Sequence, residues 1–302
     1  MTTVLVTGAT GFIGRRLVPA LVDAGHTVRA MTRRPDDYAG VGDPVGGDVD
    51  DPASLAAALD GVGVAIYLVH ALDDPDFELK DAQAARNFSR AAADAGVRQI
   101  VYLGGLGAED DDALSAHLRS RREVEGLLSA DGVPVTTLRA AIVVGHGGIS
   151  WEITRQLVKN LPAMVVPRWA HTRSQPIGID DVVRYLAGVV DRDEALGRVF
   201  EIGGPEQLTY LEMMQVASEV SGGKRLPIIT VPVLTPRLSS YWLALVTDVD
   251  ATTGRNLIDS MSTEVIVTDT SIRDLVPGEP LTYEECVRRA LDERRTSAED
   301  RG

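Results

Sequence analysis

The stretch VLVTGATGFIG, residues 4–14, decides the fold of this chain. Its first three residues form a short apolar run, which predicts a buried parallel strand. Residues 15–24 carry apolar side chains at helical spacing, which predicts a helix. A strand, a glycine loop and a helix in this order are typical of a site that binds the pyrophosphate of a dinucleotide. The loop between strand and helix has three glycines at three-residue intervals: Gly8, Gly11 and Gly14.

Each glycine of this loop has an expected task. Gly8 permits a tight turn, Gly11 lets a phosphate approach the backbone, and Gly14 lets the helix lie close to the strand. The helix start offers free N–H groups and the positive end of its dipole to the anion. An alternative is a glycine turn that only joins a strand to a helix. The cofactor contacts expected from the rest of the loop are Thr10, Phe12 and Ile13.

The spacing GxxGxxG, preceded by Thr7, resembles the extended and atypical branches of the short-chain dehydrogenase/reductase superfamily, which include NAD-dependent epimerases and dehydratases. The resemblance covers about residues 1–205 and implies an NAD(P)-binding Rossmann protein. Further segments follow in the order that this family has: GGDVDDPASLAAALDGV (46–62), QIVYLGGLG (99–107), PVTTLRAAIVVG (134–145) and PIGIDDVVRYL (176–186).

The alternation of apolar strands and helical stretches predicts an α/β fold, a doubly wound parallel sheet with a smaller C-terminal α+β lobe. We assign residues 1–150 and about 176–205 to the dinucleotide-binding domain. About 151–175 and 206–302 then form a substrate-binding lobe. Expected strands are 3–7, 27–32, 44–47, 63–69, 98–104, 134–139 and 199–203. Expected helices are 12–24, 52–60, 77–95, 113–130, 151–160, 180–190, 210–221, 236–248 and 282–295, with a loop over 162–176 and a frayed tail from Arg295.

Composition narrows the partners and the location. The formal net charge is −14, so nucleic acid and anionic membrane surfaces are not expected partners. The single cysteine, Cys286, excludes an internal disulfide, and no signal peptide or membrane-length apolar run is present. We expect a cytoplasmic protein, a monomer or homodimer, acting on a small molecule. The five histidines form no metal-binding motif, so no metal site is expected.

The residues after the second strand favour NADP(H) over NAD(H). An NAD site usually has an acidic residue about 20 positions beyond the glycine loop, where it binds the ribose 2′-hydroxyl. Here Thr32 takes that place, followed by Arg33 and Arg34. A guanidinium pairs with a 2′-phosphate, whereas a carboxylate repels it. We therefore predict Arg33 as the main contact and Arg34 as its support, the alternative being two exposed arginines that only solubilise a turn.

Four more cofactor contacts follow from the resemblance. Asp48 and Val49 match the stretch that lies against the adenine, while a helix cap ahead of Pro52 suits Asp50 or Asp51 better. His70 follows the fourth strand and should face the nicotinamide ribose, although a structural role is equally open. The family's serine position falls on Gly104 and its neighbour Gly105.

The catalytic pair that the resemblance implies is changed. Related enzymes use Tyr-x-x-x-Lys on the helix after the fifth strand, whereas HLRSRREVE (117–125) places His117 and Arg121 there. Arg121 stays charged and cannot relay protons. His117 titrates near neutrality and is a candidate general acid/base, while the neighbouring Arg121 favours its neutral form. The alternative is a helix with no proton-transfer pair.

Candidate substrate contacts are Arg139, Trp151 and Trp169. Arg139 ends a strand on the cleft side, where it can anchor an acid or a cofactor phosphate, or form a structural ion pair. Trp169 lies in a basic and aromatic loop, PRWAHTR (167–173), that is either a lid or plain surface. The leading hypothesis is an NADP(H)-dependent oxidoreductase acting on a small carbonyl or enone-type compound. A non-catalytic NADP(H)-binding redox sensor or scaffold is the second, and a sugar-nucleotide epimerase or dehydratase the third.

Overall fold

The computed structural model describes residues 1–72, 74–107, 114–160, 164–166, 168–223, 225, 227–230 and 259–299. Its centre is a seven-stranded, fully parallel sheet with strand order β11-β6-β5-β4-β1-β2-β3. The strands are β1 (Thr3–Val6), β2 (Thr27–Thr32), β3 (Asp43–Gly46), β4 (Val64–Tyr67), β5 (Gln99–Gly105), β6 (Val135–Ala140) and β11 (Val199–Ile202). From β1 the sheet grows in one direction through β2 and β3, and in the other through β4, β5, β6 and β11. This strand order is the doubly wound Rossmann topology that the sequence predicted.

Helices cover both faces of the sheet because alternate strand side chains point to opposite sides. Val4 and Val6 of β1 lie in a core with α1 (Gly14–Asp23), α6 (Ile179–Gly188) and α10 (Ile272–Leu275). Leu5 lies in a second core with α2 (Pro52–Leu59), α3 (Phe77–Asp94) and α4 (Ala116–Leu128). The strand is therefore apolar from Val4 to Val6, where it is buried on both faces.

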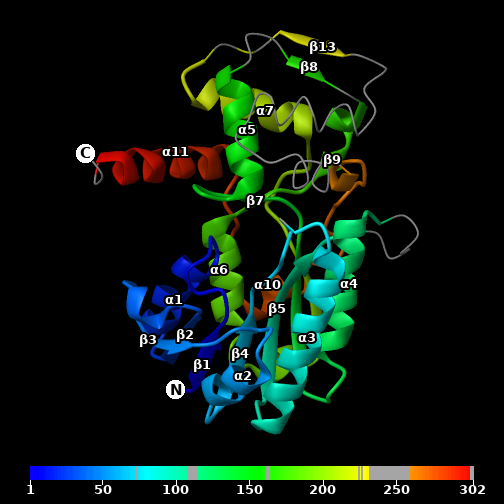
Figure 1. The fold of residues 1–302 in the computed structure, drawn as a ribbon. Coiled ribbons are helices and arrows are strands. Elements are labelled where there is room, and N and C mark those ends of the chain that lie inside the picture. The colour runs from blue at the N-terminus through cyan, green and yellow to red at the C-terminus, as the bar shows by residue number, and fades with distance from the viewer. Residues whose placement is uncertain are drawn as a thin grey trace.

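A smaller lobe stands at the end of the sheet where the strands finish (Figure 1). It has its own apolar core, built from α5 (Ile149–Asn160), α7 (Tyr210–Val220) and α11 (Tyr283–Glu299). Three short strand pairs accompany these helices: parallel β7 (Val143–Val144) with β10 (Ile177–Gly178), antiparallel β9 (Arg173–Ser174) with β12 (Leu208–Thr209), and parallel β8 (Met164–Val166) with β13 (Ile228–Thr230).

The expected elements of the sheet are confirmed to within a few residues. Two expectations for the lobe are wrong. Residues 162–176 are not only loop, because β8, β9 and the 3₁₀ helix Arg168–His171 lie there, and α11 continues to Glu299 instead of fraying at Arg295. The expected helix 236–248 lies outside the described residues. Among the helices in the described part, none has the length and apolarity that crossing a bilayer requires. The remaining short 3₁₀ turns are Pro35–Asp37 and Asp193–Ala195.

Candidate dinucleotide site and cleft

The glycine loop has the geometry that a pyrophosphate site needs. Gly8 has a φ of 62°, a conformation that side chains rarely adopt. A Cβ on Gly14 would lie 2.3 Å from the Gly8 carbonyl oxygen and 2.7 Å from the Ala9 Cα, so only glycine lets α1 begin against the strand. Gly11 and Thr10 are exposed at the loop's tip. No described residue accepts a hydrogen bond from the backbone N–H of Phe12 or Ile13, and no side chain caps α1. These donors remain available to an anion.

The two arginines after β2 lie in the bend that follows the strand. Arg33 and Arg34 are both exposed, and neither forms an ion pair with a described residue. The backbone N–H of Arg34 donates to Thr32 Oγ1 at 3.2 Å, which turns the chain sharply after the strand. Both guanidinium groups are therefore accessible to a 2′-phosphate.

The segment after β3 forms a tight polar turn. Asp48 Oδ1 accepts from the N–H of Asp50 at 3.0 Å, and the N–H of Asp48 donates to Ser54 Oγ at 2.9 Å. Val49 is buried. The cap of α2 is Asp51, whose Oδ1 accepts from the N–H of Ala53 at 3.0 Å, so one of the two residues expected for this role has it. An adenine contact by Asp48 or Val49 stays a prediction.

His70, His117 and Arg121 come together at the ends of β4 and β5. His70 follows β4, while His117 and Arg121 lie one turn apart on α4. The helix can approach β5 because a Cβ on Gly105 would lie only 2.8 Å from the Leu118 side chain. On Gly104 the same atom would lie 3.1 Å from the Tyr102 ring. The Arg121 guanidinium lies over that ring, 5.6 Å from its centroid, which fixes a permanent positive charge at this end of the sheet.

This charge changes the expected chemistry of His117. Loss of hydration, together with the positive charge of Arg121, lowers the pKa of His117 to about 3. The expectation that His117 titrates near neutrality is therefore wrong, while the expected direction of Arg121's effect is confirmed. His70 keeps contact with solvent, yet surrounding protein removes part of its hydration and, with Arg121, lowers its pKa as well. At neutral pH the cleft presents two uncharged imidazoles beside one guanidinium.

The sequence analysis missed a buried carboxylate that holds this arrangement. Asp81, on α3, is 5% exposed; its Oδ1 accepts from the N–H of Ala71 at 2.8 Å and its Oδ2 accepts from Ser120 Oγ at 3.4 Å. It thus ties the loop that carries His70 to the helix that carries Arg121. The available signal was its spacing, since Asp81 lies on the same helical face as the buried Phe77 and Phe88.

Arg139 does not face the cleft as a free cation. Its Nε and Nη2 donate to the two carboxylate oxygens of Glu125 at 3.0 and 2.7 Å, and both side chains are 16% exposed. The expected anchor for a substrate acid is therefore corrected to the structural ion pair, because the bidentate contact uses the fork of the guanidinium. Glu125 belongs to α4, so the pair also fixes this helix against β6.

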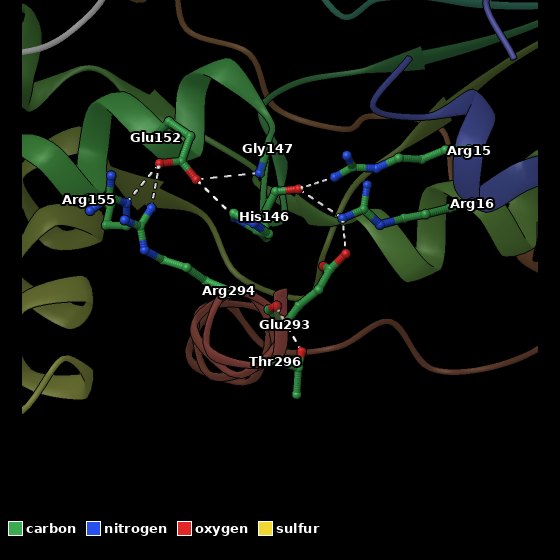
Figure 2. Close-up of polar contacts among 9 residues, drawn as sticks. All are labelled: Arg15, Arg16, His146, Gly147, Glu152, Arg155, Glu293, Arg294 and Thr296. Carbon is green, nitrogen blue, oxygen red and sulfur yellow. Dashed lines mark hydrogen bonds and ion pairs between the residues drawn. The ribbon is translucent and has the colours of Figure 1, made fainter. Parts of the chain in front are cut away.

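The lobe is joined to the helix of the glycine loop by a polar cluster (Figure 2). Arg16 of α1 donates to the carbonyl oxygens of Phe12 and His146, both at 2.8 Å, and pairs with Glu293 of α11. Arg15 donates to the same His146 carbonyl at 2.9 Å. Glu152 of α5 accepts from His146 Nδ1, from the N–H of Gly147 and from the guanidinium groups of Arg155 and Arg294. Helices α5 and α11 are thereby held directly behind the cofactor loop.

The two candidate tryptophans lie together inside the lobe. Trp151 of α5 is 1% exposed and Trp169 is 9% exposed, and both line one apolar pocket. Neither indole N–H has a hydrogen-bond partner among the described residues. Within the same part of the chain, no three His, Cys, Asp or Glu side chains are grouped as a metal site would require.

The model of a family described as NAD(P)H-binding matches residues 8–169, which include the glycine loop and the cleft residues. The chain belongs to this NAD(P)H-binding family. The resemblance expected from the sequence is thereby confirmed, and epimerase-like proteins are among the similar structures. The loop geometry agrees with this family, because free N–H groups and closely packed glycines are what a dinucleotide pyrophosphate requires.

Similar members of this NAD(P)H-binding family include reductases. A (4-alkanoyl-5-oxo-2,5-dihydrofuran-3-yl)methyl phosphate reductase of Streptomyces griseus is 32% identical over 72% of this chain and 74% of its own. A ceramide reductase of Caulobacter vibrioides is 31% identical over 78% of both chains. The fold matches the triphenylmethane reductase of Citrobacter sp. complexed with NADP(H), with a TM-score of 0.77, 22% identity and coverage of 95% of this chain and 100% of the other.

Proposed function

We propose that this protein is an NADPH-dependent reductase of a small carbonyl or enone-type compound. The observation that carries the proposal is the fixed charge of Arg121 beside the neutral His117, at the strand ends that the glycine loop also faces. Support comes from the reductase relatives, one of which is named for a substrate with an alkanoyl group on an oxo-dihydrofuran ring. That substrate is of the carbonyl and enone type.

The cleft residues suit charge stabilisation more than proton transfer. When bound, a dihydronicotinamide supplies the hydride, and the acceptor oxygen becomes negative as its carbon is reduced. Arg121 stabilises that negative charge, and the neutral imidazole of His117 donates an N–H hydrogen bond. Because the lowered pKa leaves His117 unprotonated near neutrality, the proton that completes the reduction comes from water.

We further propose NADP(H) as the preferred cofactor, bound by Arg33 with Arg34 in support. Replacing Arg33 with Asp should invert the preference, because a charge-assisted contact to the 2′-phosphate contributes about 1.5–3 kcal/mol and a carboxylate repels it. Calorimetric titration with NADPH and NADH measures this. Arg90→Asp makes the same charge change on exposed α3 and should leave the ratio of affinities unchanged. If Arg33→Asp and the wild type have the same ratio of NADPH to NADH affinity, Arg33 does not bind the 2′-phosphate.

Measuring catalytic turnover distinguishes the proposed reductase from a non-catalytic redox sensor or scaffold. Purified protein with NADPH and a panel of enones and ketones is followed at the nicotinamide absorbance band. Arg121→Met should lower kcat by about 10²–10³-fold, as removal of an oxyanion-stabilising group does. Arg119→Met, on the same helix but exposed, is the control and should keep the wild-type rate.

A non-catalytic redox sensor or scaffold is the second candidate. The lowered pKa of His117 favours it, since this imidazole is then not a proton donor near neutrality. Tight NADPH binding without turnover of any panel member would select this role. A reducing location such as the cytoplasm suits both candidates, because the one cysteine is buried and forms no disulfide.

A further inference from the structure

The described part of the lobe contains an apolar pocket with two buried hydrogen-bond donors that have no partner. Its walls come from α5, α7 and the turn after β8, with Trp151, Trp169, Tyr210, Met213, Met214 and Met261 among the lining side chains. The Trp169 and Tyr210 rings meet edge to face with centroids 5.8 Å apart. None of the described lining residues is charged.

The unpaired indole N–H groups need an explanation. A buried donor without a partner is costly, and native proteins keep few of them. Trp151 is fully enclosed and Trp169 nearly so, so solvent at the protein surface does not satisfy either donor. Because both tryptophans line one pocket, an occupant with hydrogen-bond-accepting atoms would satisfy these donors.

The side chains that line the pocket also indicate the chemical nature of the ligand. Aromatic and methionine side chains favour an uncharged, largely apolar ring, because no charge is available to compensate an ionic ligand. The free space between the side chains is about 20 Å³, room for about one water molecule. A ring therefore enters as side chains move, and Met213, Met214 and Met261 are the flexible, polarisable kind that adapt to a ligand.

One contact connects the pocket with the cleft. Ser260, next to the lining residue Met261, has its hydroxyl 2.8 Å from the hydroxyl of Ser115. Ser115 caps the start of α4, two residues before His117. The segment that carries Met261 therefore contacts the start of the helix that carries His117 and Arg121.

We infer that this pocket binds a neutral ring compound through an oxygen atom that accepts from the indole N–H of Trp151 or Trp169. The further statement that this ring compound is the apolar part of the substrate rests on the proposed function. Binding of a ring compound in the pocket does not depend on the proposed function, so binding is measured without cofactor and without turnover.

Calorimetry with two probes of nearly the same shape tests the inference. 2-Acetylnaphthalene carries an acceptor oxygen and 2-ethylnaphthalene does not. The wild-type protein should bind the acetyl compound about three- to tenfold more tightly, the value of one net hydrogen bond. The double variant Trp151→Phe/Trp169→Phe keeps one aromatic ring at each position but removes both donors, and it should bind the two probes equally. Tyr185→Phe, buried in the other core, is the control and should keep the difference.

A spectroscopic measurement covers the case in which the double variant fails to fold. The chain has three tryptophans, so ¹⁵N-labelled wild-type protein gives three indole N–H signals. At least one signal that a single Phe substitution assigns to Trp151 or Trp169 should shift with 2-acetylnaphthalene and not with 2-ethylnaphthalene. Equal binding of both probes by the wild type, a difference that persists in the double variant, or a pocket that only water occupies would overturn the inference. Such a result would not bear on NADPH binding or turnover, so the proposed reductase function is tested independently of this pocket.

Discussion

Gly14→Ala is the sharpest test of how the glycine loop is built. The added Cβ would lie 2.3 Å from the carbonyl oxygen of Gly8, 2.7 Å from the Cα of Ala9 and 2.9 Å from the Gly8 carbonyl carbon. All three are backbone atoms, so no side-chain rotation can relieve the contact. The start of α1 must move away from the loop by several tenths of an ångström or more.

The size of the effect follows from that movement. Overpacking of a tightly packed site costs about 1–3 kcal/mol in the free energy of unfolding. A displaced loop also loses at least one charge-assisted hydrogen bond to the cofactor phosphate, worth about 1.5–3 kcal/mol, which is about a tenfold to hundredfold loss of affinity. Urea denaturation measures the first quantity, and fluorescence titration with NADPH measures the second.

Gly126→Ala is the matched control. Gly126 is exposed on α4, and nothing lies within 4 Å of an added Cβ. Alanine is the better helix former, so this variant should be more stable than the wild type by about 0.5–1 kcal/mol with unchanged NADPH affinity. If Gly14→Ala unfolds within about 0.5 kcal/mol of the wild type and binds NADPH equally well, the close approach of α1 to the loop is not what the site requires.

Three further outcomes follow from the electrostatics. The pKa of His117 is lower in the folded protein than in the unfolded chain, so the unfolded chain binds a proton first as the pH drops. The free energy of unfolding should therefore fall between pH 6.5 and about pH 3, by at most about 1.4 kcal/mol per pH unit. Urea denaturation of the wild type and of His117→Asn over this pH range measures the effect. Arg139→Met leaves the half-buried Glu125 carboxylate without its partner and should lower the free energy of unfolding by about 1–3 kcal/mol. Burial raises the pKa of Cys286 to about 12, so a thiol reagent at pH 8 should label the native protein far more slowly than the unfolded chain.

Each of these three predictions would be contradicted by a specific result. An identical loss of stability with pH in His117→Asn would assign the effect to other groups. Arg139→Met with wild-type stability would mean that Glu125 is adequately hydrated when alone. Equal labelling rates for native and unfolded protein would show that the α11 thiol is accessible.

The sequence by itself determined the sheet and the loop, because both depend on local patterns. Continuous apolar runs such as Val4–Val6 predict strands buried on both faces, and the glycine spacing predicts the turn that follows. Gly25, Gly61, Gly96 and Gly132 each follow a helix and have positive φ values, the conformation in which glycine commonly ends a helix. The prediction for Arg33 likewise depends on its position alone, since an exposed residue directly after a strand needs no distant partner to place it.

Only the tertiary structure decided what the cleft residues do. The sequence left Arg139 open between an anchor and a structural ion pair until the fold brought Glu125 against it. His117 was expected to titrate near neutrality until loss of hydration beside Arg121 lowered its pKa. Asp81 and the unpaired indoles of Trp151 and Trp169 were hidden for the same reason. Charge, hydration and hydrogen bonding depend on neighbours that are far away in the chain, whereas strands, turns and helix ends depend on neighbours that are close.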